Sequence, residues 1–323
     1  MTSKENVMLG IDGSLTDLHS HPDMYWQAKW DGYRGKLVFQ NGHVSVLNRN
    51  GSDEWTPRLP DVVEGLQQFA TATGAARFTL DAELVVFQEG HSSLSAIASR
   101  CKTQNLQMIQ LKLRRLYPVD VMLFDIIEWD DQRLESDPLM NRHNLLTSLY
   151  STYSKAVAGQ PKHVQLTPNY LDVDTAWNEW VVKRHEEGLM AKDPMSPYVY
   201  ERSSSWLKVK IRDSGTFHVV GYTAGDGNRS DTFGALILAD DVGVCRGRCG
   251  GGFSWAAQDS TARQILQALR QAPVINPPFS EAEVGLPYTA VDTKMQVKVA
   301  FLKTFNGSSK LRSPQLIDWW IPQ

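Results

Sequence analysis

The chain has 323 residues, 42% of them hydrophobic, and a formal net charge of −3 at pH 7. This length suggests two globular domains, since a domain commonly has about 100–200 residues. The charge argues against a general nucleic-acid-binding protein, which usually has a basic composition, although it allows a local basic groove. No apolar run of about 18 residues is present, so we expect no membrane span.

The three cysteines, Cys101, Cys245 and Cys249, lack the spacing of a disulfide framework or a zinc site. The first residues lack the apolar core of a signal peptide. We therefore expect a cytoplasmic protein with reduced thiols. His19 and His21 could bind a metal, but a polar loop is the better interpretation of that stretch.

The first two thirds of the chain mixes strands and helices. Asn41-Gly42, between strands predicted at residues 36–40 and 43–47, is typical of a tight hairpin. Pro60 opens a helix with one apolar face, which extends to about Ala70. Further strands are predicted at 25–28, 77–88, 117–128, 186–193 and 205–211, and further helices at 94–115, 138–150 and 175–185. Antiparallel hairpins without regular β-α-β alternation predict an α+β fold.

The composition changes near Asp213, where strands and glycine turns begin to dominate. Strands are predicted at 217–223, 235–239, 243–248 and 296–305, and a helix at 255–272. About five strands with one helix suit a small β-barrel such as an OB-fold. We therefore expect domains of residues 1–212 and 213–323. From Asp213 onward the chain has 10 basic and 10 acidic residues, so this part is not a basic module.

Lys29 lies in Ala-Lys-Trp-Asp-Gly-Tyr-Arg, and we interpret it as a nucleophile. An amine attacks phosphorus only when deprotonated, and that form is favoured by nearby cations such as Arg34 and by a poorly hydrated pocket. Gly32 would let the backbone approach a ligand closely. The alternative is an exposed Asp-Gly turn with ordinary surface charges.

Four charged residues further along would complete a nucleotide site. Period-two alternation places Lys208 and Lys210 on one face of a strand, where they would hold phosphate. Glu83 and Glu187 would give oxygen ligands to a hard divalent cation. Taken alone, each is also compatible with a solvated strand face.

Other residues in these strands have simple interpretations as well. Phe124 could be a core residue, and Asp81 and Asp125 could be sheet-edge groups. The ordered combination of all these stretches along one chain is what favours a functional site.

The set Lys-x-Asp-Gly-x-Arg, Arg-x-Gly, Asp-x-Glu, Phe-Asp, Glu-Gly-x-x-x-Lys and Lys-x-Lys resembles the covalent nucleotidyltransferase superfamily. Within it, the chain is most similar to small ATP-dependent DNA ligases of viruses and bacterial accessory repair systems. The resemblance begins at about residue 27 and includes Val-Val-Gly-Tyr at 219–222, Gly-Gly-Gly-Phe at 250–253 and Leu-Arg-Ser-Pro at 311–314. It implies an adenylation domain of antiparallel sheets and helices, followed by an OB-fold domain.

The resemblance also implies three displacements at phosphorus. Lys29 would take AMP from ATP, AMP would move to the 5′-phosphate of a nick in duplex DNA, and the 3′-hydroxyl would displace AMP. Positioning and charge neutralisation, with Mg²⁺ or Mn²⁺ as Lewis acid, would carry most of the catalysis. The enzyme would act as a monomer in DNA repair, replication and recombination.

Individual roles follow from the same resemblance. Glu83 would contact ribose or metal, Glu187 would bind the metal, and Phe124 would stack on adenine. Catalytic roles are expected for Lys29, Arg34, Glu83, Glu187, Lys208 and Lys210. Nucleotide contacts are expected from Gln27, Ala28, Lys29, Arg34, Arg49, Glu83, Phe124, Glu187, Lys192, Lys208 and Lys210. DNA contacts are expected from Arg34, Arg114, Arg115, Arg229, Arg246 and Arg248.

An RNA ligase or an mRNA-capping guanylyltransferase, with the same covalent chemistry, is the alternative function. A catalytically silent nucleic-acid-binding adaptor is a further alternative, which the intact Lys29 and Glu83 argue against. Residues 213–323 contain no Arg-x-Asp-Lys motif, so the group that orients pyrophosphate stays open. Asp226 and Asn228 stand where such ligases often have lysines, which predicts a weaker grip on DNA there.

Overall fold

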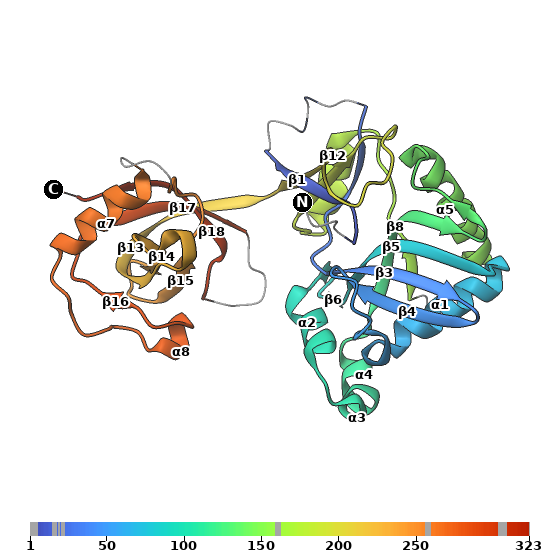
Figure 1. Ribbon diagram of the computed structural model, residues 1–323, viewed down its shortest axis with the longest axis horizontal. Coiled ribbons are helices and arrows are strands. Elements are labelled where there is room, and N and C mark those ends of the chain that lie inside the picture. The colour runs from blue at the N-terminus through green and yellow to red at the C-terminus, as the bar shows by residue number, and fades with distance from the viewer. Residues whose placement is uncertain are drawn as a thin grey trace. The chain divides into compact units, whose positions relative to one another are not determined.

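Figure 1 shows the computed structural model, which describes residues 6–14, 18, 20, 23–158, 163–255, 260–302 and 309–322. His19 and His21 lie outside these residues. The chain divides into two compact units, Met1–Lys210 and Ile211–Gln323. Within the described residues, no helix has the length and apolar character needed to cross a membrane.

The larger unit contains a six-stranded sheet in the order β10-β8-β5-β3-β4, with β9 paired to β8. Its strands are β3 (Tyr33–Gln40), β4 (His43–Asn48), β5 (Arg77–Val85), β8 (Asp120–Trp129), β9 (Gln132–Arg133) and β10 (Val164–Leu166). The predicted hairpin of β3 and β4 is confirmed, and Asn41 and Gly42 both have positive φ, as a two-residue turn of this kind requires. A short hairpin of β6 (Phe87–Gln88) and β7 (His91–Ser92) follows β5.

Two helices, α1 (Pro60–Thr73) and α5 (Leu139–Ala156), pack on this sheet and on each other (Figure 1). The predicted apolar face of α1 is confirmed, because Leu66 and Phe69 are fully buried. Phe69 meets Phe78 of β5 edge to face, with ring centroids 5.6 Å apart. Burial of each such side chain contributes about 1.5–3 kcal/mol, so this core fixes the position of the sheet. The 3-10 helix η2 (Thr56–Arg58) precedes α1.

The other face of this sheet carries polar residues. In β5, Leu80 and Leu84 belong to the core, so period-two alternation turns Asp81 and Glu83 to the opposite face. Asp81 and Asp125 are fully buried in interior strands. The interpretation of these two aspartates as sheet-edge groups is therefore wrong.

A second sheet of four strands has the order β1-β12-β11-β2. Its strands are β1 (Leu9–Gly13), β2 (Tyr25–Ala28), β11 (Gly188–Lys192) and β12 (Arg202–Lys210). β1 runs parallel to β12, and the other pairs are antiparallel. Phe124 of the larger sheet and Trp206 of this one share a buried cluster with Tyr198. The two sheets therefore meet at a common apolar contact.

Two segments predicted as single helices are interrupted. Residues 94–116 contain α2 (Leu94–Lys102), α3 (Leu106–Met108), the π-helix η3 (Ile109–Leu113) and α4 (Arg114–Leu116); residues 173–183 contain α6 (Val173–Ala176) and the π-helix η4 (Trp177–Lys183). Ser93 and Asn105 each accept a hydrogen bond from the backbone N–H three residues on. Each therefore caps the start of a new helix, which explains the break between α2 and α3.

The smaller unit has a six-stranded sheet in the order β15-β14-β13-β17-β18, with β16 paired to β13. Its strands are β13 (Arg212–Ala224), β14 (Phe233–Ala239), β15 (Cys245–Cys249), β16 (Thr289–Ala290), β17 (Gln296–Leu302) and β18 (Arg312–Trp320). β18 was not predicted, because Leu316 is its one buried residue and no apolar alternation marks it.

The helices of this unit are η5 (Gly227–Arg229), α7 (Thr261–Gln271) and α8 (Glu281–Val284). Ile265 and Leu269 of α7 are fully buried in the core. Gly251, which follows β15, forms a parallel bridge with Gln315 of β18, and the Leu316 N–H donates to the Gly251 carbonyl at 2.9 Å. Within the described ranges, the edge strands are joined by this bridge and not by a ladder.

Candidate active site

A pocket of about 270 Å³ is lined by residues from both sheets of the larger unit. This volume is close to the lower end of the range usual for small-ligand sites. Every residue predicted to contact a nucleotide lines the pocket, except Glu187. The remaining lining residues are Leu9, Gly10, Trp30, Met190 and Trp206.

Lys29 follows β2, whose Ala28 pairs with Leu189 of β11. Its backbone N–H donates to the Gly188 carbonyl at 2.9 Å, and its Nζ donates to Oε2 of Glu187 at 2.5 Å. The side chains of Lys29 and Glu187 are 16% and 8% exposed. Strand pairing thus places the predicted nucleophile beside a partly desolvated carboxylate.

Gly32 packs against β5 and is needed for that contact. A Cβ atom on Gly32 would lie 2.4 Å from the Leu84 carbonyl oxygen and 2.8 Å from Cγ of Glu83. Real Cβ atoms do not approach this closely, so a larger residue would push the turn away from β5. Gly32 therefore allows the turn to pack closely against β5.

A buried carboxylate that was not predicted from the sequence supports the same turn. The Asp31 N–H donates to the Ser92 hydroxyl at 2.7 Å, and the Ser92 hydroxyl and N–H both donate to the Glu186 carboxylate. Burial raises the pKa of Glu186 to about 7, although the hydrogen bonds from Ser92 lower it. Glu186 precedes Glu187, so one short segment contacts both the turn, through Ser92, and Lys29.

Arg34 of β3 is held by Asp81 through two hydrogen bonds, Nε to Oδ1 at 2.8 Å and Nη2 to Oδ2 at 2.5 Å. Burial opposes its charge, but Asp81 keeps the pKa of Arg34 above its ordinary value. The guanidinium carbon lies 5.0 Å from the centroid of the Phe124 ring and 5.4 Å from that of Trp206. Arg34 is therefore fixed at the pocket wall.

Glu83 pairs in register with Arg34 and lines the pocket. Burial raises the pKa of the Glu83 carboxyl to about 8, against the effect of the Lys29 and Arg34 charges. Among the residues described, no three or more His, Cys, Asp or Glu side chains cluster in a way that could hold a metal ion. A cation here would need ligands beyond Glu83 and Glu187.

Lys192 is the most deeply buried cation of the pocket. Its side chain is 2% exposed, and its Nζ has no hydrogen-bond partner among the described residues. Nζ lies 4.0 Å from the ring centroids of both Phe124 and Trp206. Burial lowers the pKa of Lys192 to about 7, although Asp125 acts in the opposite direction. Phe124 is displaced at a bulge in β8, which turns its ring toward this lysine.

Lys208 and Lys210 both line the pocket from β12, as their alternation predicts. Burial lowers the pKa of Lys208 to about 8, although Asp12 opposes this shift. Lys210 Nζ lies 3.7 Å from Oδ1 of Asp12 in the neighbouring strand β1. The exposed carboxylate of Asp12 thus lies near both ammonium groups.

Gln27 and Arg49 lie at different depths. Gln27 is buried and its Nε2 donates to Oδ1 of Asn169 at 2.6 Å. Arg49 follows β4 and is exposed, while still lining the pocket. The interior of the pocket therefore has an amide and aromatic rings, and Arg49 adds a cation at its exposed side.

The residues predicted to contact DNA, other than Arg34, do not line the pocket. Arg114 pairs with Glu64, and Arg115 is exposed on α4. In the smaller unit, the guanidinium carbon of Arg229 lies 4.2 Å from the centroid of the Trp255 ring. Arg114 and Arg229 therefore already interact with groups of the protein, so less of their charge is available for the predicted DNA contacts.

Arg246 and Arg248 flank the buried Gly247 in β15. Nη2 of Arg246 lies 2.8 Å from Oδ2 of Asp240, and Nη1 donates to the Ser309 carbonyl at 3.1 Å. Arg248 is exposed. Arg248 is therefore more available to a nucleic acid than Arg246, whose charge is already paired with Asp240.

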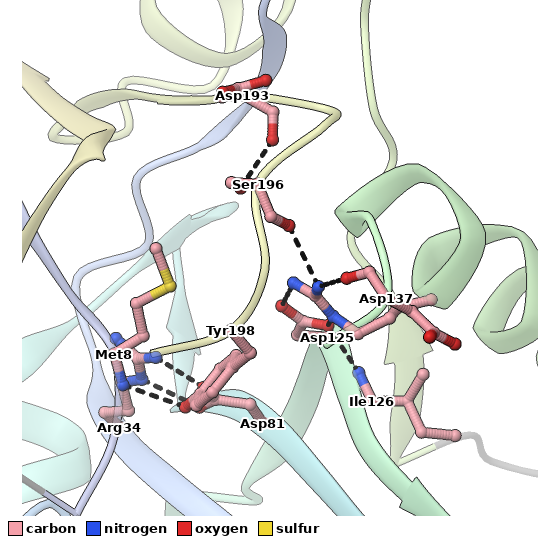
Figure 2. A network of polar contacts seen from close by, with 10 residues as sticks. Met8, Arg34, Asp81, Asp125, Ile126, Asp137, Asp193, Ser196 and Tyr198 are labelled. Atoms are coloured by element: carbon pink, nitrogen blue, oxygen red, sulfur yellow. Dashed lines mark hydrogen bonds and ion pairs between the residues drawn. The ribbon is translucent and has the colours of Figure 1, made fainter. Parts of the chain in front are cut away.

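A network of polar contacts includes the buried carboxylates of Asp81 and Asp125 (Figure 2). The Tyr198 hydroxyl donates to Oδ2 of Asp81 at 2.6 Å. Nε and Nη2 of Arg142 donate to the two carboxylate oxygens of Asp125, at 2.8 and 2.9 Å. Roles for Tyr198 and Arg142 were not predicted from the sequence, because both contacts join residues that are not neighbours in the chain.

Residues 11–210, more than half of the chain, match the family described as ATP dependent DNA ligase domain, and the chain belongs to that family. The multifunctional non-homologous end joining protein LigD of Pseudomonas aeruginosa is 29% identical over 281 residues, which cover 82% of this chain and 30% of LigD. A DNA ligase of Methanosphaera stadtmanae is 27% identical over 234 residues, which cover 71% of this chain and 40% of that protein. The chain thus spans less than half the length of these curated relatives.

Solved structures show the same fold. A structure from a study of Lig E DNA ligases superimposes with a TM-score of 0.62 at 20% identity, covering 97% of this chain and 98% of that chain. The ligase domain of M. tuberculosis LigD superimposes with a TM-score of 0.51 at 21% identity, covering 99% and 96%. The mixed sheets with few helices match the nucleotidyltransferase fold of ligase domains.

Proposed function

We propose that this protein is an ATP-dependent DNA ligase that seals nicks between a 5′-phosphate and a 3′-hydroxyl in duplex DNA, through a lysyl-AMP intermediate. The observation that carries the proposal is one pocket that contains Lys29, the ring of Phe124 and the cations Lys208 and Lys210. Family membership and the names of the curated relatives support it.

In the first step, Nζ of Lys29 attacks the α-phosphorus of ATP. A P–N bond forms, the bond to the bridging oxygen of pyrophosphate breaks, and Nζ loses its proton. Phe124 would stack on the adenine, and Lys208 and Lys210 would neutralise phosphate charge. Gln27, Arg49 and Lys192 would complete the contacts with the nucleotide.

Glu83 and Glu187 would hold Mg²⁺ or Mn²⁺. A small, hard cation of this kind commonly takes one or two carboxylates and completes its shell with phosphate oxygens and water. Glu187 contacts Lys29, and Glu83 lines the pocket whose lysines suit phosphate, so the two carboxylates fit that pattern. When bound, the cation would stabilise negative charge on the phosphate oxygens.

In the second step, the 5′-phosphate oxygen of the nick attacks the phosphorus of Lys29-AMP and the P–N bond breaks. The 3′-hydroxyl then attacks the 5′-phosphorus and AMP leaves. Arg34 lines the pocket with its guanidinium fixed beside Phe124, and we assign it the contact with the 5′-phosphate that the resemblance implies. Arg114, Arg115, Arg229, Arg246 and Arg248 would contact the DNA backbone.

We further propose that residues 1–212 are the adenylation domain and residues 213–323 an OB-fold domain. The strand order, with α7 between β15 and β17, supports a five-stranded, partly open Greek-key barrel. The bridge between Gly251 and Gln315, which links the edge strands, also supports it. A monomeric state and a cytoplasmic location stay predictions, to be checked by light scattering and by cell fractionation.

The test is incubation of the protein with α-labelled ATP or GTP and Mg²⁺, followed by intact-mass analysis. The proposal expects one adenylate per chain from ATP and none from GTP, and sealing of nicked DNA in preference to nicked RNA. A guanylylated chain would indicate capping chemistry, and preferential sealing of RNA an RNA ligase. No covalent adduct with either nucleotide would favour the silent adaptor.

A further inference from the structure

Tyr198 connects three parts of the larger unit through one hydroxyl group. Its O–H donates to Oδ2 of Asp81 at 2.6 Å, and its oxygen accepts the backbone N–H of Met8 at 3.1 Å. The side chain is 3% exposed, so water does not compete for these contacts. Figure 2 shows the hydroxyl directed at the same carboxylate that receives Arg34.

Asp81 is the shared acceptor, and it has no exposed surface. Arg34 takes both of its oxygens, Oδ1 through Nε and Oδ2 through Nη2. The hydroxyl of Tyr198 therefore restricts rotation of the carboxylate about its Cβ–Cγ bond. Because a bidentate pair is planar, the orientation of that carboxylate sets the plane of the Arg34 guanidinium.

The segment that carries Tyr198 is itself held rigidly. Nη1 of Arg142 donates to the carbonyls of Ser196, at 3.1 Å, and of Asp137. The N–H of Leu139, at the start of α5, also donates to the Ser196 carbonyl, at 2.9 Å. With Arg142 fixed by Asp125, the hydroxyl of Tyr198 is presented from a rigid support (Figure 2).

We propose that Tyr198 is a positioning residue for Arg34, acting through Asp81. This inference rests on the proposed function in assigning Arg34 to the 5′-phosphate of the nick. Loss of the hydroxyl leaves the charge of Arg34 intact and removes one of the contacts that orient its carboxylate partner. The transfer of AMP to DNA then slows more than the formation of Lys29-AMP, because Lys29 is held by Gly188 and Glu187 and not by Asp81 or Tyr198.

The test compares Tyr198→Phe with Tyr200→Phe. Tyr200 is a matched control, since it lies two residues on and its hydroxyl donates to Glu135 at 3.2 Å instead of to Asp81. Single-turnover transfer of AMP from the adenylated protein to nicked DNA should slow by about 10- to 100-fold in Tyr198→Phe, as for loss of one hydrogen bond to a charged group. Self-adenylation should change by less than about threefold, and Tyr200→Phe should match the parent in both assays.

Two further measurements distinguish positioning from a general loss of structure. In an Arg34→Ala background, Tyr198→Phe should have no additional effect on transfer, because the two changes remove one unit. In NMR spectra, the Nε–H of Arg34, assigned by its loss in Arg34→Lys, should exchange with solvent about tenfold faster in Tyr198→Phe than in Tyr200→Phe. Additive effects, or unchanged exchange, would overturn the proposal.

The NMR arm does not depend on enzyme activity. If the parent chain forms no Lys29-AMP while Arg34 exchange still responds to Tyr198→Phe, the proposed function fails and the link from Tyr198 to Arg34 stands. If the parent seals nicks and Tyr198→Phe behaves as Tyr200→Phe in every assay, the link fails and the proposed function stands.

Discussion

Nζ of Lys29 lies 2.5 Å from Oε2 of Glu187, in a contact made by the pairing of β2 with β11. Lys29 follows the end of β2, and Glu187 immediately precedes β11, so the antiparallel register brings the two side chains together. For Lys29 to attack phosphorus, this contact has to be exchanged for one with the substrate. We therefore expect Glu187 to help place Lys29, in addition to its proposed part in binding a cation.

The first prediction is that Lys29→Ala abolishes self-adenylation. Sealing of a pre-adenylated nick should suffer less, because that step needs no lysine nucleophile. Lys29→Arg should behave as Lys29→Ala, since a guanidinium stays protonated. Intact-mass analysis measures the adduct, and an adduct on either variant would remove Lys29 from the role.

The second prediction concerns the two carboxylates. Glu187→Ala and Glu83→Ala should each slow sealing by at least about two orders of magnitude, comparable to loss of one preorganised electrostatic contact, with a smaller effect on ATP binding. Glu179→Ala is the control, because Glu179 pairs with Lys183 and Arg184 outside the pocket. Sealing by Glu187→Ala at near the parental rate would contradict the assignment.

The third prediction uses the buried Lys192. Its pKa is about 7 in the folded protein, against an ordinary value of 10.5. Below pH 7, Lys192 is protonated in both the folded and the unfolded chain, so the folded chain bears the full cost of burying its charge. Between pH 7 and 10.5, Lys192 loses its proton in the folded chain only, and this cost declines. Lys192→Met should therefore raise the free energy of unfolding below about pH 7. The increase is at most about 1.4 kcal/mol for each unit of difference between the two pKa values. It should become smaller as the pH rises toward about 10.

Denaturant titrations of the nucleotide-free protein at several pH values measure this difference. Lys183→Met, at an exposed lysine, is the control and should show little dependence on pH. A gain from Lys192→Met that is constant with pH, or a loss at about pH 6, would show that the charge of Lys192 is not the source of the effect.

Much of the pocket could be predicted from the sequence, because its residues lie in short motifs on strands. Alternation alone places Lys208 and Lys210 on one face of β12, and the dipeptide Asn41-Gly42 sets the register of β3 with β4. Each relationship is between residues a few positions apart, so the spacing of residue types along the chain is enough to predict it.

The supporting contacts could not be predicted in this way. Tyr198 and Asp81 are 117 positions apart, and Glu186 and Ser92 are 94 apart. Their meeting depends on how the two sheets pack, which no local pattern encodes. The start of a new helix, α3, after Asn105 was not predicted. The helical spacing of apolar residues continues past this point, so the spacing does not show that Asn105 caps a separate helix.

The last prediction concerns the grip on DNA in the smaller unit. If arginines of this unit neutralise phosphates, affinity for nicked duplex should fall with salt, by a log–log slope of roughly −0.9 per contact. Arg248 is exposed, whereas Arg246 already pairs with Asp240. Arg248→Ala should therefore flatten the slope by about one unit, Arg246→Ala by less, and the double variant by about 1–2 units.

The experiment is a salt titration of nick binding for the parent, both single variants and the double variant, with Arg270→Ala as a control of equal charge on α7. Self-adenylation should change little in all of them, since neither Arg246 nor Arg248 lines the pocket that contains Lys29. An unchanged slope in the double variant would move the DNA contact to another surface. Lost adenylation with unchanged binding would instead place the pair at the pyrophosphate, the position for which residues 213–323 supply no Arg-x-Asp-Lys motif.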